Sequence, residues 1–525
     1  MRNINFISGC FERRTPESQG IPSSAITDCL DEIIRADENV HSLHVFRNGY
    51  QIAGGCAKPF DMLTPRRVYS TMKSVICIAV LFLVQEGKLS FENKVVDFFG
   101  DAVPKNCSDL MKSLSVRNIL NMSVGHELDA LRIFHETNYG AGMIPFTLRD
   151  KSASLSFNPE GMTLEQIFFS LPMAFRPGER FCYVNSVPEM LIRLITKACG
   201  EDFIHYLQPR FFEPLSIDVF NCQETWMEGW APDEPFHRPD EAVIGYLDGA
   251  TTVTSTQDLC KFALFLLQDG CWEGVRLLSH DLIKEATALH LPTKKLTAKP
   301  NYASDMDSYG YGMQIWRNQY GGFKMAGGSG QAAIMIPELE FAVVYTAMNT
   351  HLATEGTVIP ELVRDCLYKE IRYQGIDENP EEYMRMQQRF ESWSTAPENL
   401  STNPDAEGTH NGKWNAAEEC DGITALDFAP ESSKVTIWQG ERSCELVYGA
   451  RGDFVVNRES PLHKAEGYSY VYGSDRKVVS ASGGWKSTDG RDSFVLQLQY
   501  ACDMVAFRYC AEFLLDRIIK LRRMN

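Results

Sequence analysis

Apolar and polar positions divide the chain into a region of mixed helices and strands followed by a region of short alternating strands. In the first region, dense or periodic apolar positions predict helices at residues 25–35, 70–85, 164–170, 186–198, 256–268 and 357–370. Strands are expected at 42–47 and directly after the turn Asn48-Gly49, a dipeptide typical of a hairpin, and again at 332–336 and 341–348. This pattern predicts an α+β domain.

The pattern changes near residue 393. Residues 393–413 are rich in Ser, Thr, Pro, Asn and Gly and carry almost no apolar side chains, which is typical of a linker. Beyond it, alternating stretches predict strands at 434–438, 454–457, 478–481 and 493–500. We therefore expect a first domain over residues 1–395, a linker at 396–413 and a small antiparallel β domain at 414–525.

Charge argues against nucleic acid as a partner. The 525 residues include 51 Lys and Arg against 69 Asp and Glu, a net charge of −18, and no stretch rich in Lys or Arg occurs. The basic residues near the end are interpreted as the solvated end of a helix: Arg517, Lys520, Arg522 and Arg523. The acidic balance also disfavours a strongly anionic substrate.

Hydropathy and cysteine usage bear on the cellular compartment and on membrane and metal binding. The longest uncharged apolar stretch, residues 75–84, is shorter than the roughly 20 residues of a membrane-spanning helix. The N-terminal residues lack the apolar core of a secretory signal, and the 15 cysteines form no Cys-x-x-Cys pair or Cys/His cluster at metal spacing. We expect a cytoplasmic protein with buried thiols, no membrane contact, no metal and no cofactor.

The first candidate for chemistry is the tetrad Ser70-Thr71-Met72-Lys73 at the start of the predicted apolar helix. A spacing of three residues places the Ser70 hydroxyl and the Lys73 amine on one helix face, and a helix N-terminus favours negative charge. A lysine desolvated by apolar neighbours can accept the serine proton. The alternative is a serine that caps the helix beside a solvated lysine. A second match, Ser474 to Lys477, lies in a polar stretch without an apolar helix.

Two further elements add to this candidate. Tyr183 and Asn185 directly precede a predicted helix, where a phenol can shuttle protons and an amide can hold the lysine or a substrate carbonyl; the alternative is a packed tyrosine and a capping asparagine. The glycine-rich residues 327–331 precede a predicted strand and can offer backbone N–H groups to a closely approaching substrate. The alternative here is a tight turn.

In this order, the three elements resemble the serine beta-lactamase-like superfamily, which includes penicillin-binding proteins, class C beta-lactamases, esterases, D-aminopeptidases and 6-aminohexanoate-dimer hydrolases. Five stretches are similar to segments of that family: residues 14–22, 121–126, 175–185, 248–259 and 308–312. The resemblance implies the beta-lactamase/transpeptidase-like fold, an antiparallel sheet flanked by helices with an all-α subdomain inserted after the nucleophile helix. A weaker likeness at residues 481–485 implies the C-terminal β domain that some members carry.

The resemblance also implies roles for individual residues. By this resemblance, Ser70 is the acylated nucleophile, Lys73 its proton acceptor and Tyr183 the general acid/base, while Asn185 positions the substrate and the lysine. The oxyanion hole consists of the backbone N–H groups of Ser70 and of a residue at or near Gly328. Apart from the resemblance, Tyr311, Trp316 and Lys324 are candidate pocket-lining residues; the alternative for Tyr311 and Trp316 is the interior of the strands.

One departure from the family pattern bears on the substrate. The third family motif begins with Lys or His, but Met325 occupies that place here and Lys324 is one residue out of register. In members that recognise lactams this cation holds the substrate carboxylate, so its absence favours an ester or a small amide over a penicillin-type ligand.

The sequence therefore predicts a serine hydrolase that cleaves a small ester or amide through an acyl-enzyme. The alternative is a catalytically inactive relative that binds a ligand or serves in assembly, and a cysteine hydrolase ranks third because no Cys–His arrangement is local. Ester, amide and D-peptide substrates, residual beta-lactamase activity, the role of the β domain and a homo-oligomeric state all stay open.

Overall fold

A computed structural model describes most of the chain. The described residues are 6–7, 10–36, 39–64, 66–139, 155, 157–217, 220–221, 252–293, 309–318, 320–348, 358–396, 400, 410–450, 453–457, 479–488, 491–500, 506–513 and 517–524. Within these ranges, every helix is too short or too polar to cross a membrane.

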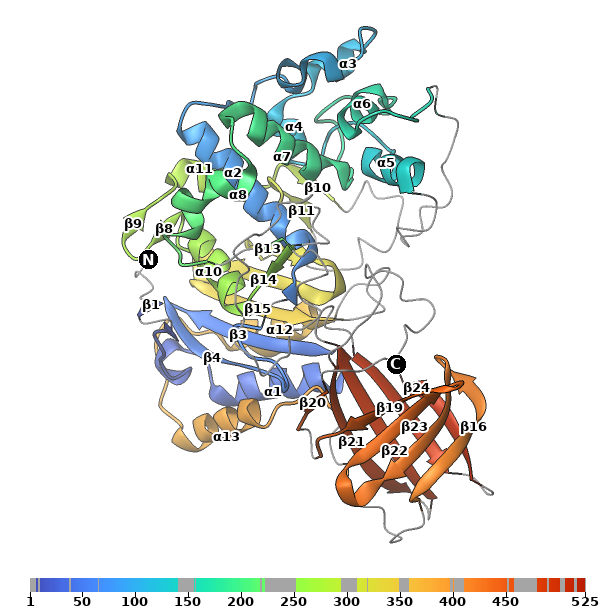
Figure 1. Ribbon diagram of the computed structural model, residues 1–525. Helices are drawn as coiled ribbons and strands as arrows, with labels where there is room; N and C mark the ends of the chain where they lie inside the picture. Colours follow the sequence, from blue (N-terminus) through green and yellow to red (C-terminus); the bar gives the residue numbers. More distant parts are fainter. Residues whose placement is uncertain are drawn as a thin grey trace.

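The first region is built on an eight-stranded antiparallel sheet. Its strand order is β10-β11-β12-β13-β14-β15-β3-β4, so the hairpin formed by the early strands β3 and β4 completes a sheet whose other strands come late in the chain (Figure 1). The strands are β10 (Leu291–Pro292), β11 (Gly310–Tyr311), β12 (Trp316–Arg317), β13 (Phe323–Gly327), β14 (Gln331–Ile336), β15 (Phe341–Ala347), β3 (Val40–Arg47) and β4 (Tyr50–Cys56).

The predicted hairpin is confirmed, and its turn has the expected geometry. Asn48 and Gly49 both have positive φ, 50° and 85°, which matches the twist of the two strands that they join. The predicted strands at 332–336 and 341–348 correspond to β14 and β15.

Helices cover both faces of this sheet. Alternate residues of β14 face opposite sides: Ala332 and Ile334 join an apolar cluster with α1 (Ser23–Arg35), α12 (Ile359–Leu367) and α13 (Pro380–Glu391), whereas Ala333 and Met335 join the cluster around α2 (Met72–Gln85) and α10 (Thr256–Leu267). The second cluster continues into a helical subdomain inserted after α2, as expected. It comprises α3 (Asp109–Ser113), α4 (Val116–Leu120), α5 (Ala130–Tyr139), α6 (Leu164–Ser170), α7 (Ser186–Cys199) and α8 (Phe203–Leu207).

Smaller elements complete this region. They are β1 (Phe6–Ile7) with β2 (Cys10–Phe11), the three-stranded sheet of β5 (Arg66–Arg67), β7 (Thr252–Thr254) and β6 (Phe220–Asn221), the pair β8 (Cys271–Trp272) and β9 (Val275–Arg276), and α11 (His280–Thr287). Of the family-like stretches, residues 248–251 and 308 lie outside the described residues.

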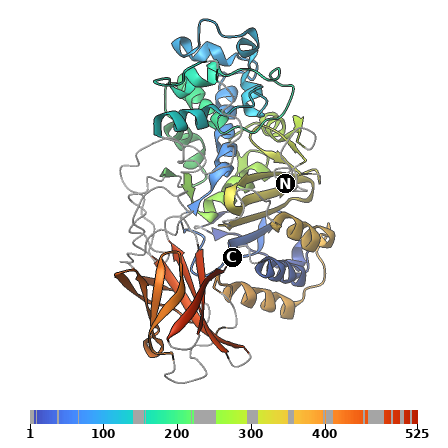
Figure 2. The ribbon, with the colours of Figure 1, turned by 90° about the vertical axis from the view of Figure 1, so that its right-hand side faces the viewer.

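The C-terminal region is a single nine-stranded, nearly closed sheet, and in two perpendicular views it lies at the end of the molecule opposite the helical subdomain (Figures 1 and 2). Its order is β19-β18-β17-β16-β24-β23-β22-β21-β20. The strands are β16 (Gly412–Cys420), β17 (Ile423–Ala429), β18 (Lys434–Gln439), β19 (Arg442–Val447), β20 (Val455–Asn457), β21 (Val479–Thr488), β22 (Arg491–Tyr500), β23 (Ala506–Phe513) and β24 (Ile518–Met524).

Two features of this domain differ from the sequence-based expectation. Strands β16 and β24 run parallel, an exception to the expected antiparallel order. The basic tail is not the end of a helix: β24 is a strand in which Ile519 and Leu521 are buried between exposed Lys520 and Arg522. The period of two between apolar and basic residues places them on opposite faces.

A side chain links the two edges of this sheet. The Asn457 amide Nδ2 donates to the Val447 carbonyl at 2.9 Å, and its Oδ1 accepts the Val447 N–H at 2.9 Å. Both hydrogen-bonding groups of Val447 are thereby satisfied, as a neighbouring strand would satisfy them.

His126 lies in the core of the helical subdomain, against the ring of Phe168 at a centroid distance of 4.7 Å. The side chain is fully buried, and neither ring nitrogen has a hydrogen-bond partner among the described residues. Burial lowers the pKa of His126 from 6.5 to about 3, so the folded protein keeps this ring neutral.

This burial predicts a dependence of stability on pH. Below pH 6.5 the unfolded chain takes up a proton on His126 that the folded chain refuses, so stability is full above that pH and falls with acidification. The difference reaches about 2 kcal/mol at about pH 5, and His126→Leu removes it, because leucine has no proton to gain. Urea unfolding of parent and variant at about pH 7.5 and pH 5 measures the change.

The matched control is Phe168→Leu, because this ring packs against His126 and carries no titratable group. Its effect on the free energy of unfolding should be the same at both pH values. The same pH dependence in His126→Leu as in the parent would contradict the lowered pKa.

Candidate active site

Ser70 and Lys73 lie together at the start of helix α2. Ser70 is in the single turn Tyr69–Thr71 that leads into the helix, and Lys73 follows within the first helical turn. The Lys73 Nζ atom donates a hydrogen bond to Ser70 Oγ at 2.7 Å. A nucleophile and its proton acceptor need this contact distance.

Lys73 is buried, with 3% of its surface exposed. The cause is the sequence of α2, which is buried continuously from Met72 to Leu83 and runs between the sheet and the helical subdomain. The alternative of a solvated lysine beside a capping serine is therefore wrong, and no side chain caps the start of α2.

Tyr183 lies beside this pair. Its ring centroid is 5.1 Å from Lys73 Nζ. The ring also stacks on Trp316, with centroids 5.8 Å apart and planes at 18°. Trp316 in turn contacts Tyr311 and Phe181, with centroids 4.9 Å and 5.7 Å away. The structure thus brings together Tyr183, Tyr311 and Trp316, three predicted site residues.

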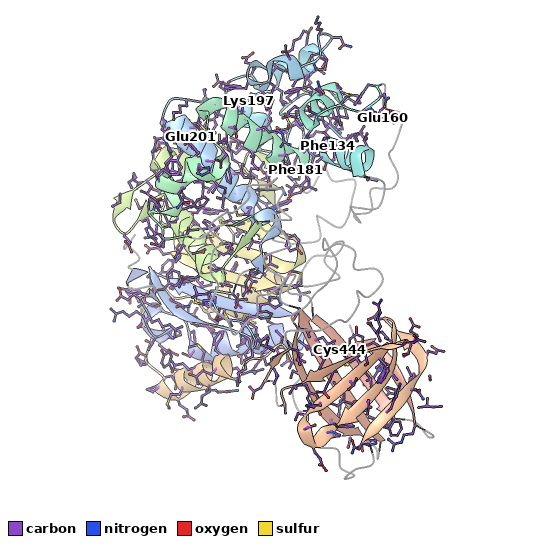
Figure 3. All side chains as sticks on the ribbon, in the orientation of Figure 1. Phe134, Glu160, Phe181, Lys197, Glu201 and Cys444 are labelled. Atoms are coloured by element: carbon purple, nitrogen blue, oxygen red, sulfur yellow. The ribbon has the colours of Figure 1, made fainter. Side chains whose placement is uncertain are left out.

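Of the two tyrosines, Tyr183 is the better placed for proton transfer. Tyr311 is 1% exposed, and burial together with the neighbouring Tyr183 phenol raises the pKa of Tyr311 well above its ordinary value, so that Tyr311 stays neutral. Tyr183 is half-buried and faces the lysine amine. In Figure 3, Phe181 lies close to the start of α7, and Lys197 and Glu201 lie at the opposite end of this helix.

Strand β13 passes directly against the nucleophile. A Cβ atom at Gly327 would lie 2.2 Å from the Val68 carbonyl oxygen and 3.2 Å from the backbone nitrogen of Ser70, so only glycine fits. The next residue, Gly328, begins a short turn, and a Cβ atom there would lie 3.7 Å from the ring of Tyr69. Residues 328–330 form a turn, as the alternative predicted. Gly327, directly before this turn, packs against the backbone of Ser70.

Asp129 is a residue that the sequence analysis missed. Its carboxylate accepts the backbone N–H groups of Asn185 and Ser186 at 2.8 Å and 2.9 Å, and so caps helix α7 from a different part of the chain. This cap fixes the segment that carries Tyr183. The signal was absent from the local sequence, since 56 residues separate Asp129 from Asn185.

Gln314 was missed as well. With a φ of 56° it turns the chain between β11 and β12, and its backbone carbonyl accepts the Ser74 hydroxyl at 2.8 Å. Its amide donates to the Leu120 carbonyl at 2.8 Å. Gln314 therefore links the turn between β11 and β12 to α2, through Ser74, and to α4 of the helical subdomain, through Leu120.

The structure does not bring two predicted residues to Ser70. The Asn185 side chain is exposed and makes no hydrogen bond to Lys73 within the described part of the chain; nor does it cap α7, as the alternative held. Lys324 is 3% exposed and stands opposite Ile334 in the sheet, on the face that packs on α1 and α12. Met325, fully buried, takes the face toward α2.

Among the residues described, no group of three or more His, Cys, Asp or Glu side chains could hold a metal ion. The groups assembled around Ser70 are an amine, a phenol and backbone amides.

The protein combines a sheet covered by helices on both faces, an inserted helical subdomain and a Ser–Lys pair at the start of helix α2. Together these features are typical of one class of protein. A family model described as Beta-lactamase matches residues 12–366. The chain belongs to the beta-lactamase family, and it has the beta-lactamase/transpeptidase-like fold with a C-terminal all-β domain.

Solved structures similar to this chain include three relatives. They are the octameric penicillin-binding protein homologue from Pyrococcus abyssi (15% identity, TM-score 0.48, 95% of this chain and 99% of that chain), the hydrolase EstCE1, which has promiscuous acyltransferase activity (16%, 0.48, 66% and 97%), and a D-stereospecific amidohydrolase from Streptomyces sp. (15%, 0.44, 65% and 97%).

The contact at Gly327 generates a prediction. Gly327→Ala should lower the free energy of unfolding by about 1–3 kcal/mol, because the new methyl group meets backbone that cannot move without displacing Ser70. Gly328→Ala is the matched control: its methyl group would have no neighbour closer than 3.7 Å. Urea unfolding of the two variants tests this difference, and equal stability would show that β13 does not approach Ser70 so closely.

Proposed function

We propose that this protein is a serine hydrolase that cleaves a small ester or amide through an acyl-enzyme on Ser70. The observation that carries the proposal is the 2.7 Å hydrogen bond between the buried Lys73 amine and Ser70 Oγ. A lysine removed from water and directed at a single hydroxyl is arranged as a proton acceptor.

The acylation step follows from the positions of the groups. The Lys73 amine takes the Ser70 proton as Oγ attacks the substrate carbonyl carbon. The negative charge then develops on the carbonyl oxygen, where the backbone N–H groups of Ser70 and Gly328 serve as donors; the close approach at Gly327 supports this pairing. As the bond between the carbonyl carbon and the leaving group breaks, Tyr183 gives its proton to the departing alcohol or amine and takes the proton held by Lys73.

The deacylation step uses the same groups in reverse. Water attacks the acyl carbon and gives one proton to the Tyr183–Lys73 pair. The pair passes a proton to Ser70 Oγ as the bond between Oγ and the acyl carbon breaks, which releases the acid and restores the hydroxyl. Asn185 is assigned to the substrate side of the site. Its exposed side chain, next to the segment that carries Tyr183, is available to a ligand.

The substrate is proposed to lack a carboxylate at the place where lactam-binding relatives hold one. Met325 is the residue of β13 that faces α2 at this point, and the cation of Lys324 belongs to the other face of the sheet. Trp316, beside Tyr183, adds a half-buried aromatic surface that favours an uncharged acyl group.

The test is labelling with a fluorophosphonate followed by intact-protein mass spectrometry, together with turnover of short p-nitrophenyl esters and of a chromogenic cephalosporin. We expect one adduct on the parent and none on Ser70→Ala. Lys73→Met should lower kcat by roughly 10²–10⁴-fold, the usual contribution of a general base, because it keeps the bulk of the side chain and removes the amine.

Ser74→Ala is the matched control for the label. Ser74 is a buried hydroxyl on the same helix, but it donates to the Gln314 carbonyl and has no lysine partner. This variant should keep the adduct. An unlabelled parent without turnover would contradict the proposal and favour the inactive, ligand-binding relative.

A further inference from the structure

The C-terminal β domain contacts the first region around Thr395. Gln497 Nε2 on β22 donates to Thr395 Oγ1 at 3.1 Å, and Arg508 Nη2 on β23 donates to the Thr395 carbonyl at 3.1 Å. Arg508 Nε also bonds Gln497 Oε1 at 3.1 Å. Thr395 itself is bonded to Lys58, through its N–H at 3.0 Å and its hydroxyl at 3.1 Å. Polar groups of the β domain thus reach the segment that follows β4.

An apolar contact lies beside this polar one. Phe60 and Met348, both from the first region and both buried, belong to the same cluster of apolar side chains as the core of the β domain. Tyr69, which directly precedes the nucleophile, packs against this cluster. Through Phe60 and Met348, the apolar cluster of the β domain therefore reaches the residue next to Ser70.

Tyr69 has an unusual backbone conformation. Its φ of 47° lies in the left-handed region, which is unfavourable for a non-glycine residue and persists only where the surroundings hold it. The contacts of its side chain supply that support. Tyr69 Oη donates to Met348 Sδ at 3.7 Å, and the ring lies 3.7 Å from the position of a Cβ atom at Gly328.

Tyr69 therefore contacts three parts at once. It is bonded to Ser70 through the backbone, its ring is the nearest group to the position of a Cβ atom at Gly328, and it packs on the apolar cluster that Phe60 and Met348 share with the β domain. The two backbone N–H groups assigned above to the oxyanion hole belong to the first two of these parts.

From these contacts we infer that the C-terminal β domain is a structural component of the active site. It holds the Tyr69 ring, and through this positioning residue it fixes the backbone of Ser70 and the turn at Gly328 in the geometry that binds the developing oxyanion. The inference rests on the proposed hydrolase function and adds a second domain to its machinery.

Two substitutions at residue 69 test the positioning role. Tyr69→Gly removes the ring but suits the left-handed backbone, so the chain keeps its local conformation. We expect kcat for a p-nitrophenyl ester to fall at least tenfold with KM changed less than twofold, because the oxyanion donors act in the transition state. Tyr69→Phe keeps the ring contacts and should retain most of the parent kcat.

A second pair of variants tests the role of the β domain, far along the chain from Ser70. Arg508→Met removes the guanidinium that bonds Thr395 and Gln497, and should lower kcat severalfold at unchanged KM. Arg522→Met is the matched control on the neighbouring strand, since Arg522 is 57% exposed and its ion pair with Glu512 lies within the β domain. This control should leave kcat unchanged.

The outcomes separate the inference from the function on which it rests. Fluorophosphonate labelling of the parent at Ser70, together with turnover, supports the hydrolase function. If the parent shows neither labelling nor turnover, the hydrolase function and the inference about the β domain are both overturned. If the parent is active and Tyr69→Gly keeps its kcat, the positioning role of Tyr69 is overturned. If Tyr69→Gly loses activity but Arg508→Met does not, the part assigned to the β domain is overturned. Thermal unfolding midpoints establish that each variant is folded, and Arg508→Met remains a test should Tyr69→Gly unfold.

Discussion

The burial of one amine at the beginning of an apolar helix is the constraint on which the site depends. Lys73 lies within a helix that is buried on all sides, so its nitrogen has to find a polar partner inside the protein. Ser70 Oγ is that partner. The arrangement exists because α2 runs between the large sheet and the helical subdomain, where both supply the apolar surroundings that keep water from the amine.

Features with a local cause were predictable from the sequence. Two adjacent residues, Asn48 and Gly49, determine the turn of the hairpin, and the continuous apolar residues of α2 predict a buried helix around Lys73. Contacts between distant segments were not predictable. The cap that Asp129 places on α7 and the approach of Gly327 to Ser70 each join parts of the chain that only the fold brings together. The basic C-terminal strand carried a visible period of two, which was misinterpreted because its charged residues dominated the composition.

Register decides which side chain reaches the nucleophile. In β13, a shift of one residue exchanges the two faces of the strand, so the order Lys324-Met325 places a thioether toward α2 and the ammonium group on the opposite side. Composition alone cannot distinguish these arrangements, since a lysine is present in either case. The neighbouring Gly327 fixes the register, because no other residue of this strand would fit beneath the Val68 carbonyl.

The pairing of β3 with β15 has a consequence for synthesis on the ribosome. Val45 is paired with Val343, so the first long strand emerges nearly three hundred residues before the partner that completes its sheet. Helix α2, made soon afterwards, gains its partners α7 and α8 early, but its side toward the sheet stays uncovered until β13 to β15 have left the exit tunnel. During that interval the nascent chain presents this side of α2 to chaperones and to other unfinished chains. The same apolar helix that buries the amine in the finished protein is thus a part of the nascent chain that needs protection.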